Sequence, residues 1–119
     1  MAAPNLANVT SILGTSTGAA LDTTTTTALL SNSAASGKVF KVNSMYVTNI
    51  SGSSATATVD VYDGSSGFNI ASGLTVPVGA TVVLIDKNSY IYLLEGWSIR
   101  GGASANSALE VLISYEDMS

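Results

Sequence analysis

The chain has 119 residues, enough for one domain that buries roughly two-thirds of the surface exposed by its unfolded chain. It contains no cysteine and no histidine, which excludes disulfides, thiolate metal sites and the side chain that most often acts as a general base. Only 10% of the residues are charged and the net charge is −4, so we expect neither the basic footprint of a nucleic-acid-binding protein nor strong mutual repulsion between copies. No apolar run approaches the ~20 residues of a membrane span, so no membrane partner is expected.

The first 18 residues hold four large apolar side chains and no charged one. Pro4 and the weak helix formers around it disfavour a stable helix, although the apolar spacing suits one. We therefore expect an extended N-terminal arm over residues 1–18, with room for one short strand, and a single β-sandwich domain over residues 19–119. An apolar arm needs a surface to cover it, either its own domain or a neighbouring subunit. Its candidate interface residues are Leu6, Val9, Ile12 and Leu13.

The next segments read as strands separated by short turns. The threonine run in residues 22–31 (DTTTTTALLS) favours an extended strand, because threonine is β-branched. Residues 38–50 form the longest strand candidate, and its apolar positions change parity near Asn43 and Ser44, which predicts a β-bulge. Residues 55–62 (ATATVDVY) alternate between small apolar and polar side chains, as a half-buried antiparallel strand does.

The segment from Leu74 to Tyr115 completes the predicted sheets with short apolar runs bounded by turn residues. Residues 80–86 are apolar at both parities, so this strand is either central and covered on both faces or part of an interface. Trp97 is expected in the core, residues 101–107 in a turn, and Glu116 with Asp117 in a solvated tail. The whole chain then has seven to nine strands, which predicts an all-β, antiparallel β-sandwich or jelly-roll-like fold with an extended N-terminal arm.

No catalytic constellation is visible. A serine nucleophile would need a base, and neither histidine nor a Ser-x-x-Lys arrangement is present. Asp60, Asp63 and Asp86 lack the ligand density of a calcium loop, so we expect Asp60 to be an exposed strand carboxylate and Asp63 a turn residue. We therefore expect no enzyme activity, no cofactor and no catalytic, cofactor-binding or metal-binding residue.

Three passages resemble small virion structural proteins of tailed bacteriophages, especially contractile-tailed phages of marine cyanobacteria. They are KVNSMYVTNI with the following Ser-Gly (residues 41–52), LTVPVGATVVLIDK (residues 74–87), and YLLEGWSI with LEVLISYE (residues 92–99 and 109–116). Proteins of this kind share a strand ending in "vtN" before a Gly/Ser turn, a "vPaga" corner, a "yLeeGdsi" strand pair and a last strand ending in "SYe". The resemblance covers about residues 38–118, and Trp97 replaces an acidic residue of the pattern.

The resemblance implies a non-enzymatic virion structural protein that is assembled in the host cytoplasm. The expected role is a capsid decoration or cement protein that forms homo-oligomers and contacts other virion proteins such as the major capsid protein. A neck, tail or fibre-associated component is the alternative within this class. A carbohydrate-binding β-sandwich module is the alternative from another class, and it requires several of the five tyrosines to share one exposed face.

Overall fold

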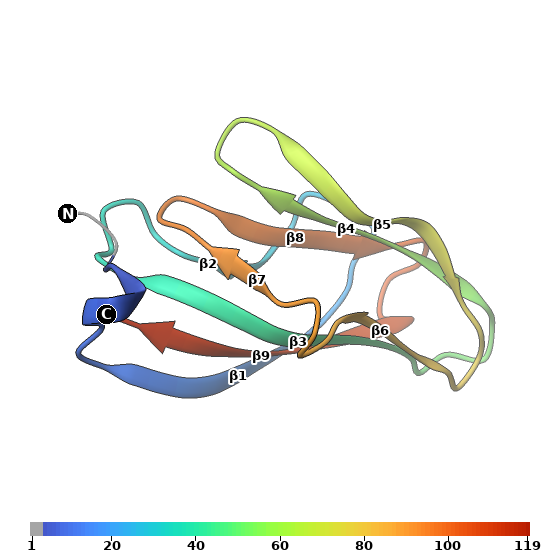
Figure 1. Cartoon of the computed structure of the whole chain (residues 1–119). Coiled ribbons are helices and arrows are strands. Elements are labelled where there is room, and N and C mark those ends of the chain that lie inside the picture. Colours follow the sequence, from blue (N-terminus) through green and yellow to red (C-terminus); the bar gives the residue numbers. More distant parts are fainter. Residues whose placement is uncertain (1–3) are drawn as a thin grey trace.

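The computed structural model describes residues 4–119 and shows a sandwich of two antiparallel sheets, 47 × 26 × 19 Å in extent (Figure 1). Sheet A has the order β1-β9-β3-β6, and β7 pairs with β3 beside β6. Its strands are β1 (Ile12–Ala20), β3 (Val39–Asn49), β6 (Thr81–Ile85), β7 (Ile91–Leu93) and β9 (Leu109–Met118). Sheet B has the order β2-β8-β4-β5, with β2 (Ala28–Ser31), β4 (Ala55–Tyr62), β5 (Gly67–Val76) and β8 (Ser98–Ala103). The predicted all-β antiparallel sandwich is confirmed.

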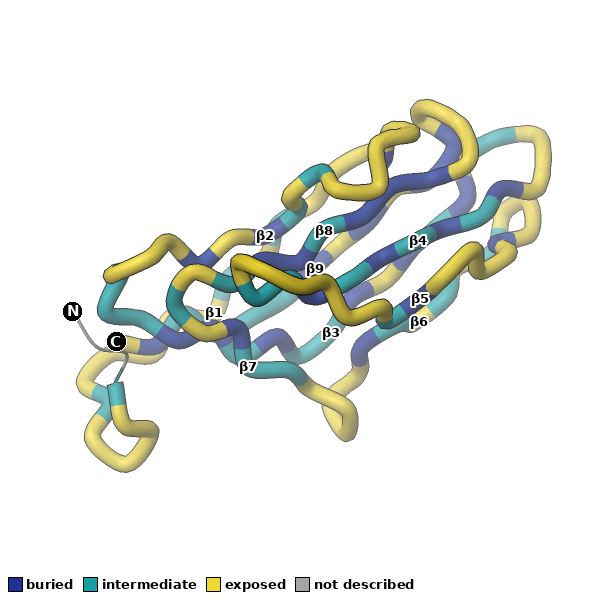
Figure 2. The backbone as a smooth tube through the Cα atoms, turned by 90° about the horizontal axis from the view of Figure 1, so that it is seen from above, coloured by how far each residue is buried: buried dark blue, intermediate teal, exposed yellow. Residues whose placement is uncertain are grey.

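The core lies between the sheets and follows the two-residue period of the strands (Figure 2). In β4, every second side chain is buried and the intervening ones are partly exposed, as the sequence of residues 55–62 predicted. The side chains that are almost fully buried come from both sheets: Val42, Met45, Val47, Val59, Val76, Leu93, Ile99, Leu109 and Ile113.

The predicted bulge in β3 is confirmed. Val42 pairs with Tyr115 and Ser44 pairs with Ser114, so Asn43 is the extra residue. The bulge keeps both Val42 and Met45 in the core, although their spacing of three would place them on opposite faces of a regular strand.

The N-terminal region is more integrated into the sandwich than an arm. A short 3-10 helix, η1 (Leu6–Asn8), is followed by β1, which pairs with β9 without interruption from Ile12 to Ala20. Residues 12–18 of the predicted arm are thus an edge strand of sheet A, because their backbone groups complete the β9 ladder. Residues 1–3 of the predicted arm lie outside the described residues.

The strand predicted over residues 22–31 is correct for residues 28–31, which form β2, and wrong for the threonines that precede them. The segment before β2 is a turn in which the Asp22 carboxylate accepts hydrogen bonds from the Thr24 amide (2.9 Å) and the Thr27 hydroxyl (3.1 Å). A single aspartate at the start of the run therefore outweighs the strand propensity of the threonines, because it satisfies the turn backbone locally.

Other expectations for the second half of the chain also change. The strand over residues 81–85 is not central: β6 lies at the edge of sheet A. Gly101 and Gly102 belong to β8 rather than to a turn. Position 102 requires glycine because the backbone of Thr24 packs where a Cβ atom would lie. Glu116 and Asp117 are not a tail but part of β9, and Lys38 Nζ lies 3.2 Å from the Asp117 carboxylate.

The single described helix has three residues, and no helix within residues 4–119 has the length and apolar character needed to cross a membrane.

Candidate interaction surface

Sheet A has one face against sheet B and one outer face that no other described strand covers, which we call the open face. Five strands contribute to it. Their outward residues are Ile12, Gly14, Ser16, Gly18 and Ala20 of β1; Glu110, Leu112, Ser114 and Glu116 of β9; Lys41, Ser44, Tyr46 and Thr48 of β3; Thr81 and Val83 of β6; and Tyr92 of β7.

A row of apolar side chains crosses the middle of the open face. Val83 of β6 lies opposite Tyr46 of β3, Tyr46 lies opposite Leu112 of β9, and Leu112 lies opposite Gly18 of β1. The exposed fractions of Val83, Tyr46 and Leu112 are 52%, 37% and 47%. Three large exposed apolar side chains in cross-strand contact form a patch rather than scattered surface residues.

A shallow depression of about 600 Å³ adjoins this row. It is lined by the small residues Gly18, Ala19 and Ala20 of β1, by Tyr46 and Leu112, and by Thr48 and Thr81, whose hydroxyl oxygens lie 2.9 Å apart. The depression exists because β1 carries no large side chain at positions where β9 and β3 carry Leu112 and Tyr46. A second depression of about 320 Å³ lies on the other side of Tyr46 and is lined by charged and polar groups, including Lys41, Lys87 and Glu116.

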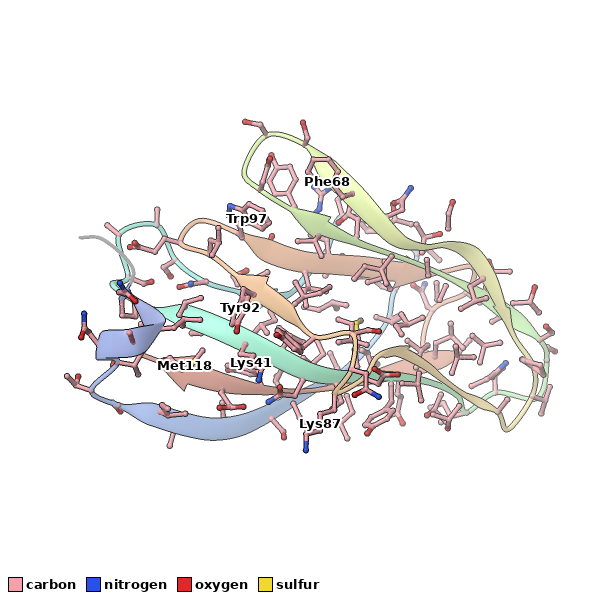
Figure 3. All side chains as sticks on the ribbon, viewed as in Figure 1. Lys41, Phe68, Lys87, Tyr92, Trp97 and Met118 are labelled. Carbon is pink, nitrogen blue, oxygen red and sulfur yellow. The ribbon has the colours of Figure 1, made fainter. Side chains whose placement is uncertain are left out.

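An aromatic and charged cluster borders the second depression. The Tyr90 and Tyr92 rings meet edge to face with centroids 5.4 Å apart, and Lys41 Nζ lies 4.4 Å from the Tyr90 centroid. Burial of the Tyr92 hydroxyl raises the pKa of this group, and the adjacent Tyr90 and the carboxylate of Glu116 raise it further. Figure 3 shows Lys41, Tyr92 and Lys87 on the sheet A side of the molecule.

The outer face of sheet B differs, because its charged residues neutralise one another. Arg100 of β8 and Asp60 of β4 form a bidentate ion pair under the ring of Tyr62. Asp60 was expected to be an exposed strand carboxylate, and this is wrong: only 14% of its side chain is exposed. Asp63 lies in a turn, as expected, where its carboxylate accepts hydrogen bonds from the amides of Ser65 and Ser66. Within residues 4–119, no cluster of three acidic side chains could hold a metal ion.

The four candidate interface residues from the N-terminal region do not form one surface. Leu6 lies in η1 and is 49% exposed, and Val9 follows it, partly buried. Ile12 and Leu13 begin β1 with 62% and 60% exposed, and as neighbours in a strand they point to opposite faces of sheet A. All four are accessible to solvent to some degree, so the domain itself does not bury this apolar surface.

Trp97 was expected in the core, and its side chain packs against the core while remaining partly exposed at the start of β8. The sequence did not reveal Tyr46, Leu112 and Val83 as neighbours, because they come from strands separated by up to 66 residues and only the sheet order unites them. The one indication in the sequence was that β6 is apolar on both of its faces. Val83 is the large apolar residue that β6 places on the open face.

Comparison with known proteins finds no matching family model, no matching curated protein and no matching solved structure.

Proposed function

We propose that the protein is a non-enzymatic structural component of a phage virion, most specifically a decoration or cement protein that binds the major capsid protein on the head and associates with its own copies. The observation that carries the proposal is the open face, where Val83, Tyr46 and Leu112 form an apolar row that the domain leaves uncovered. The phage resemblance of residues 38–118 supplies the class of partner.

The chemistry of the open face suits protein attachment. Burying one large apolar side chain contributes about 1.5–3 kcal/mol, so the row of three provides a central anchor of useful strength. Hydroxyls of Thr48 and Thr81 and the charges of Lys41 and Glu116 surround it, which resembles the polar rim of a protein interface. Repetition over a symmetric shell then multiplies a modest contact into tight attachment.

Attachment through the open face is tested with particles that lack the protein and with purified variants. Leu112→Ser combined with Tyr46→Ser should abolish co-sedimentation with the particles, because it removes the anchor. Phe68→Ser is the matched control, because Phe68 is 58% exposed but lies on β5 of sheet B. Equal binding by the wild type and the double variant would remove the open face from the proposal.

A neck, tail or fibre-associated role uses the same fold and surface, and the copy number distinguishes the two locations. A head protein is present in hundreds of copies per particle, whereas a ring at the neck or tail has roughly one or two dozen, as its rotational symmetry dictates.

Carbohydrate binding is the second candidate, and one observation favours it. Tyr46 and Tyr92 both point outward on the open face, and Tyr90 stacks edge to face on Tyr92, so three tyrosines are available on one side. Sugar rings stack on such aromatic faces, but Lys41 already occupies the face of Tyr90. A glycan array probed with the wild type and Tyr90→Ala decides: saturable binding lost in the variant supports this function, and no binding eliminates it.

A further inference from the structure

We infer that β1 pairs antiparallel with β1 of a second copy of this chain, so that the two A sheets join into one continuous sheet. The inference rests on the self-association in the proposed function and adds its surface, symmetry and register. It does not depend on the capsid, because the pairing requires only the free protein.

One side of β1 is an unused hydrogen-bonding edge. The amide of Leu21 donates to the carbonyl of Leu109, and Ser11 and Ser119 exchange hydrogen bonds between their backbones (2.9–3.0 Å). These two pairs fix which backbone groups point toward β9, because antiparallel pairs alternate along the strand. The odd-numbered residues of β1 face β9, so the amides and carbonyls of the even-numbered ones face outward: Ile12, Gly14, Ser16, Gly18 and Ala20.

This edge lacks the features that protect edges in other proteins. Charged side chains, prolines, bulges and shortness normally prevent an edge strand from pairing with another chain. β1 has nine residues, no charge, no proline and no shift of register against β9.

The other edges of the sandwich are each less suitable. β2 has four residues, β6 has five and β7 has three. β5 is longer, but its register against β4 shifts twice, and Gly73 adopts a φ of +61° within it. Only β1 among the described edge strands offers a long and regular ladder.

The side chains of β1 are complementary to those of a second β1. A two-fold axis at Ser16 places Ile12 opposite the partner's Ala20, and Leu13 opposite the partner's Ala19. Ile12 and Leu13 are 62% and 60% exposed, and both alanines are exposed, so large apolar groups at one end meet small apolar groups at the other. Gly14 and Gly18 pair in the same register, and their lack of side chains permits close approach. The five outward residues then make roughly ten backbone hydrogen bonds across the interface.

The arrangement also gives the open face a larger extent. Because β1 carries only small side chains on the open face from Gly14 to Ala20, joining two copies makes a broad shallow trough between the two apolar rows. A dimer would therefore present two anchors on one surface with a shared two-fold axis.

The pairing is tested by light scattering on the wild type, Ser16→Pro and Ser16→Ala from micromolar to millimolar concentration. Proline at this position removes an outward amide and adds a ring at the two-fold axis, without removing a backbone hydrogen bond to β9. Ser16→Ala keeps the amide and, like the proline variant, loses the hydroxyl contact with Ser114. We expect a mass twice the chain mass of 12.0 kDa for the wild type and Ser16→Ala, and a folded monomer by circular dichroism for Ser16→Pro. A wild type that stays monomeric, or a dimeric Ser16→Pro, overturns the inference.

Cysteine variants test the register and decide the matter if Ser16→Pro fails to fold. The chain has no cysteine, so single variants give unambiguous cross-links. Two Ser16→Cys residues would face each other across the axis at a Cα separation of about 5.5 Å, within disulfide range, whereas Gly14→Cys would face the partner's Gly18. We expect rapid oxidation of Ser16→Cys to a covalent dimer and little of Gly14→Cys, where a Cβ atom fits without contact. If both variants cross-link equally, or if neither cross-links, the register with its two-fold axis at Ser16 is wrong. A dimer that fails to bind particles would leave the pairing intact and refute the attachment instead.

Discussion

Arg100 and Asp60 lie directly opposite each other on β8 and β4 and form a two-point ion pair. Nε of the guanidinium donates to Oδ1 of the carboxylate at 2.9 Å, and Nη2 donates to Oδ2 at 2.6 Å. The ring of Tyr62 covers the guanidinium, whose carbon lies 3.9 Å from the ring centroid. The hydrogen bond from Arg100 to Asp60 is the main reason why the pKa of Arg100 is raised. This pair fixes the relation between two strands of sheet B and leaves its outer face without an unpaired charge at that point.

Asp60→Asn should lower the free energy of unfolding by about 1–3 kcal/mol, because it leaves a largely covered guanidinium without its counter-charge. Urea unfolding followed by tryptophan fluorescence measures the change. Glu110→Gln, at an exposed position of β9, is the control and should change stability by no more than about 0.5 kcal/mol. Equal effects of the two substitutions would show that the ion pair does not contribute to stability.

Gly67→Ala should destabilise the fold through the same ion pair. A Cβ atom at Gly67 would collide with the Asp60 carboxylate and would lie 2.8 Å from Nη2 of Arg100, so the pair would have to shift. We expect a cost of about 1–3 kcal/mol, and a smaller cost when Asp60 is already alanine. Gly52→Ala is the matched control, since a Cβ atom there meets nothing within 4 Å. Additive costs in the double variant would contradict the collision.

Asn49→Ala should be among the most damaging polar substitutions. The Asn49 side chain is buried; its Nδ2 donates to the carbonyls of Ser53 (2.8 Å) and Val76 (2.9 Å), while its Oδ1 accepts from the amide and hydroxyl of Ser51. Its removal takes a hydrogen-bond donor from the buried carbonyl of Val76, at a cost of about 2–4 kcal/mol. Asn69→Ala, at an exposed position of β5, should be nearly neutral in the same unfolding experiment. A cost below about 1 kcal/mol for Asn49→Ala would show that the hydrogen bonds of Asn49 do not hold β3 and β5 together.

Asp63 should contribute to the loss of stability in acid. Hydrogen bonds from the amides of Ser66 and Ser65 lower the pKa of Asp63 from its usual value of 3.8. A carboxyl group whose pKa is lower in the folded state stabilises that state when the pH is above the pKa of the unfolded chain. This contribution disappears as the pH falls through the pKa of the folded state. The carboxyl resonance of Asp63 should therefore titrate below 3.8 by NMR, and Asp63→Asn should be less stable than the wild type at neutral pH but converge with it in acid. A midpoint at or above 3.8 would contradict the role of these hydrogen bonds.

The sequence predicts local features of this fold well. The alternation in residues 55–62 identified β4 with its observed bounds, and the parity change at Asn43 identified the bulge, because both depend on which face each side chain must occupy. The threonine run misled because one hydrogen-bonding side chain, Asp22, decides between turn and strand. The glycines at positions 101 and 102 led to the prediction of a turn where the structure has a strand, since glycine at 102 permits close packing against Thr24.

The candidate site could be predicted only in part. Ile12 and Leu13 were expected to be covered by the domain itself or by a neighbouring subunit, and the structure leaves both exposed at one end of the free edge of β1. The open face depends on sheet order, which no local pattern encodes: β9 lies between β1 and β3, and β6 and β7 share the far side of β3. For the same reason the sequence placed Asp60 in solvent, because its partner is 40 residues away.

The most direct test of the proposed function is quantitative mass spectrometry of purified phage particles, in which the proposal requires this chain to be present. We predict that peptides of the chain are present in hundreds of copies per particle and remain after the particles are purified on a density gradient. Peptides found in the infected cell lysate but absent from the particles would contradict a virion role and leave the open face and the β1 edge in need of a different partner.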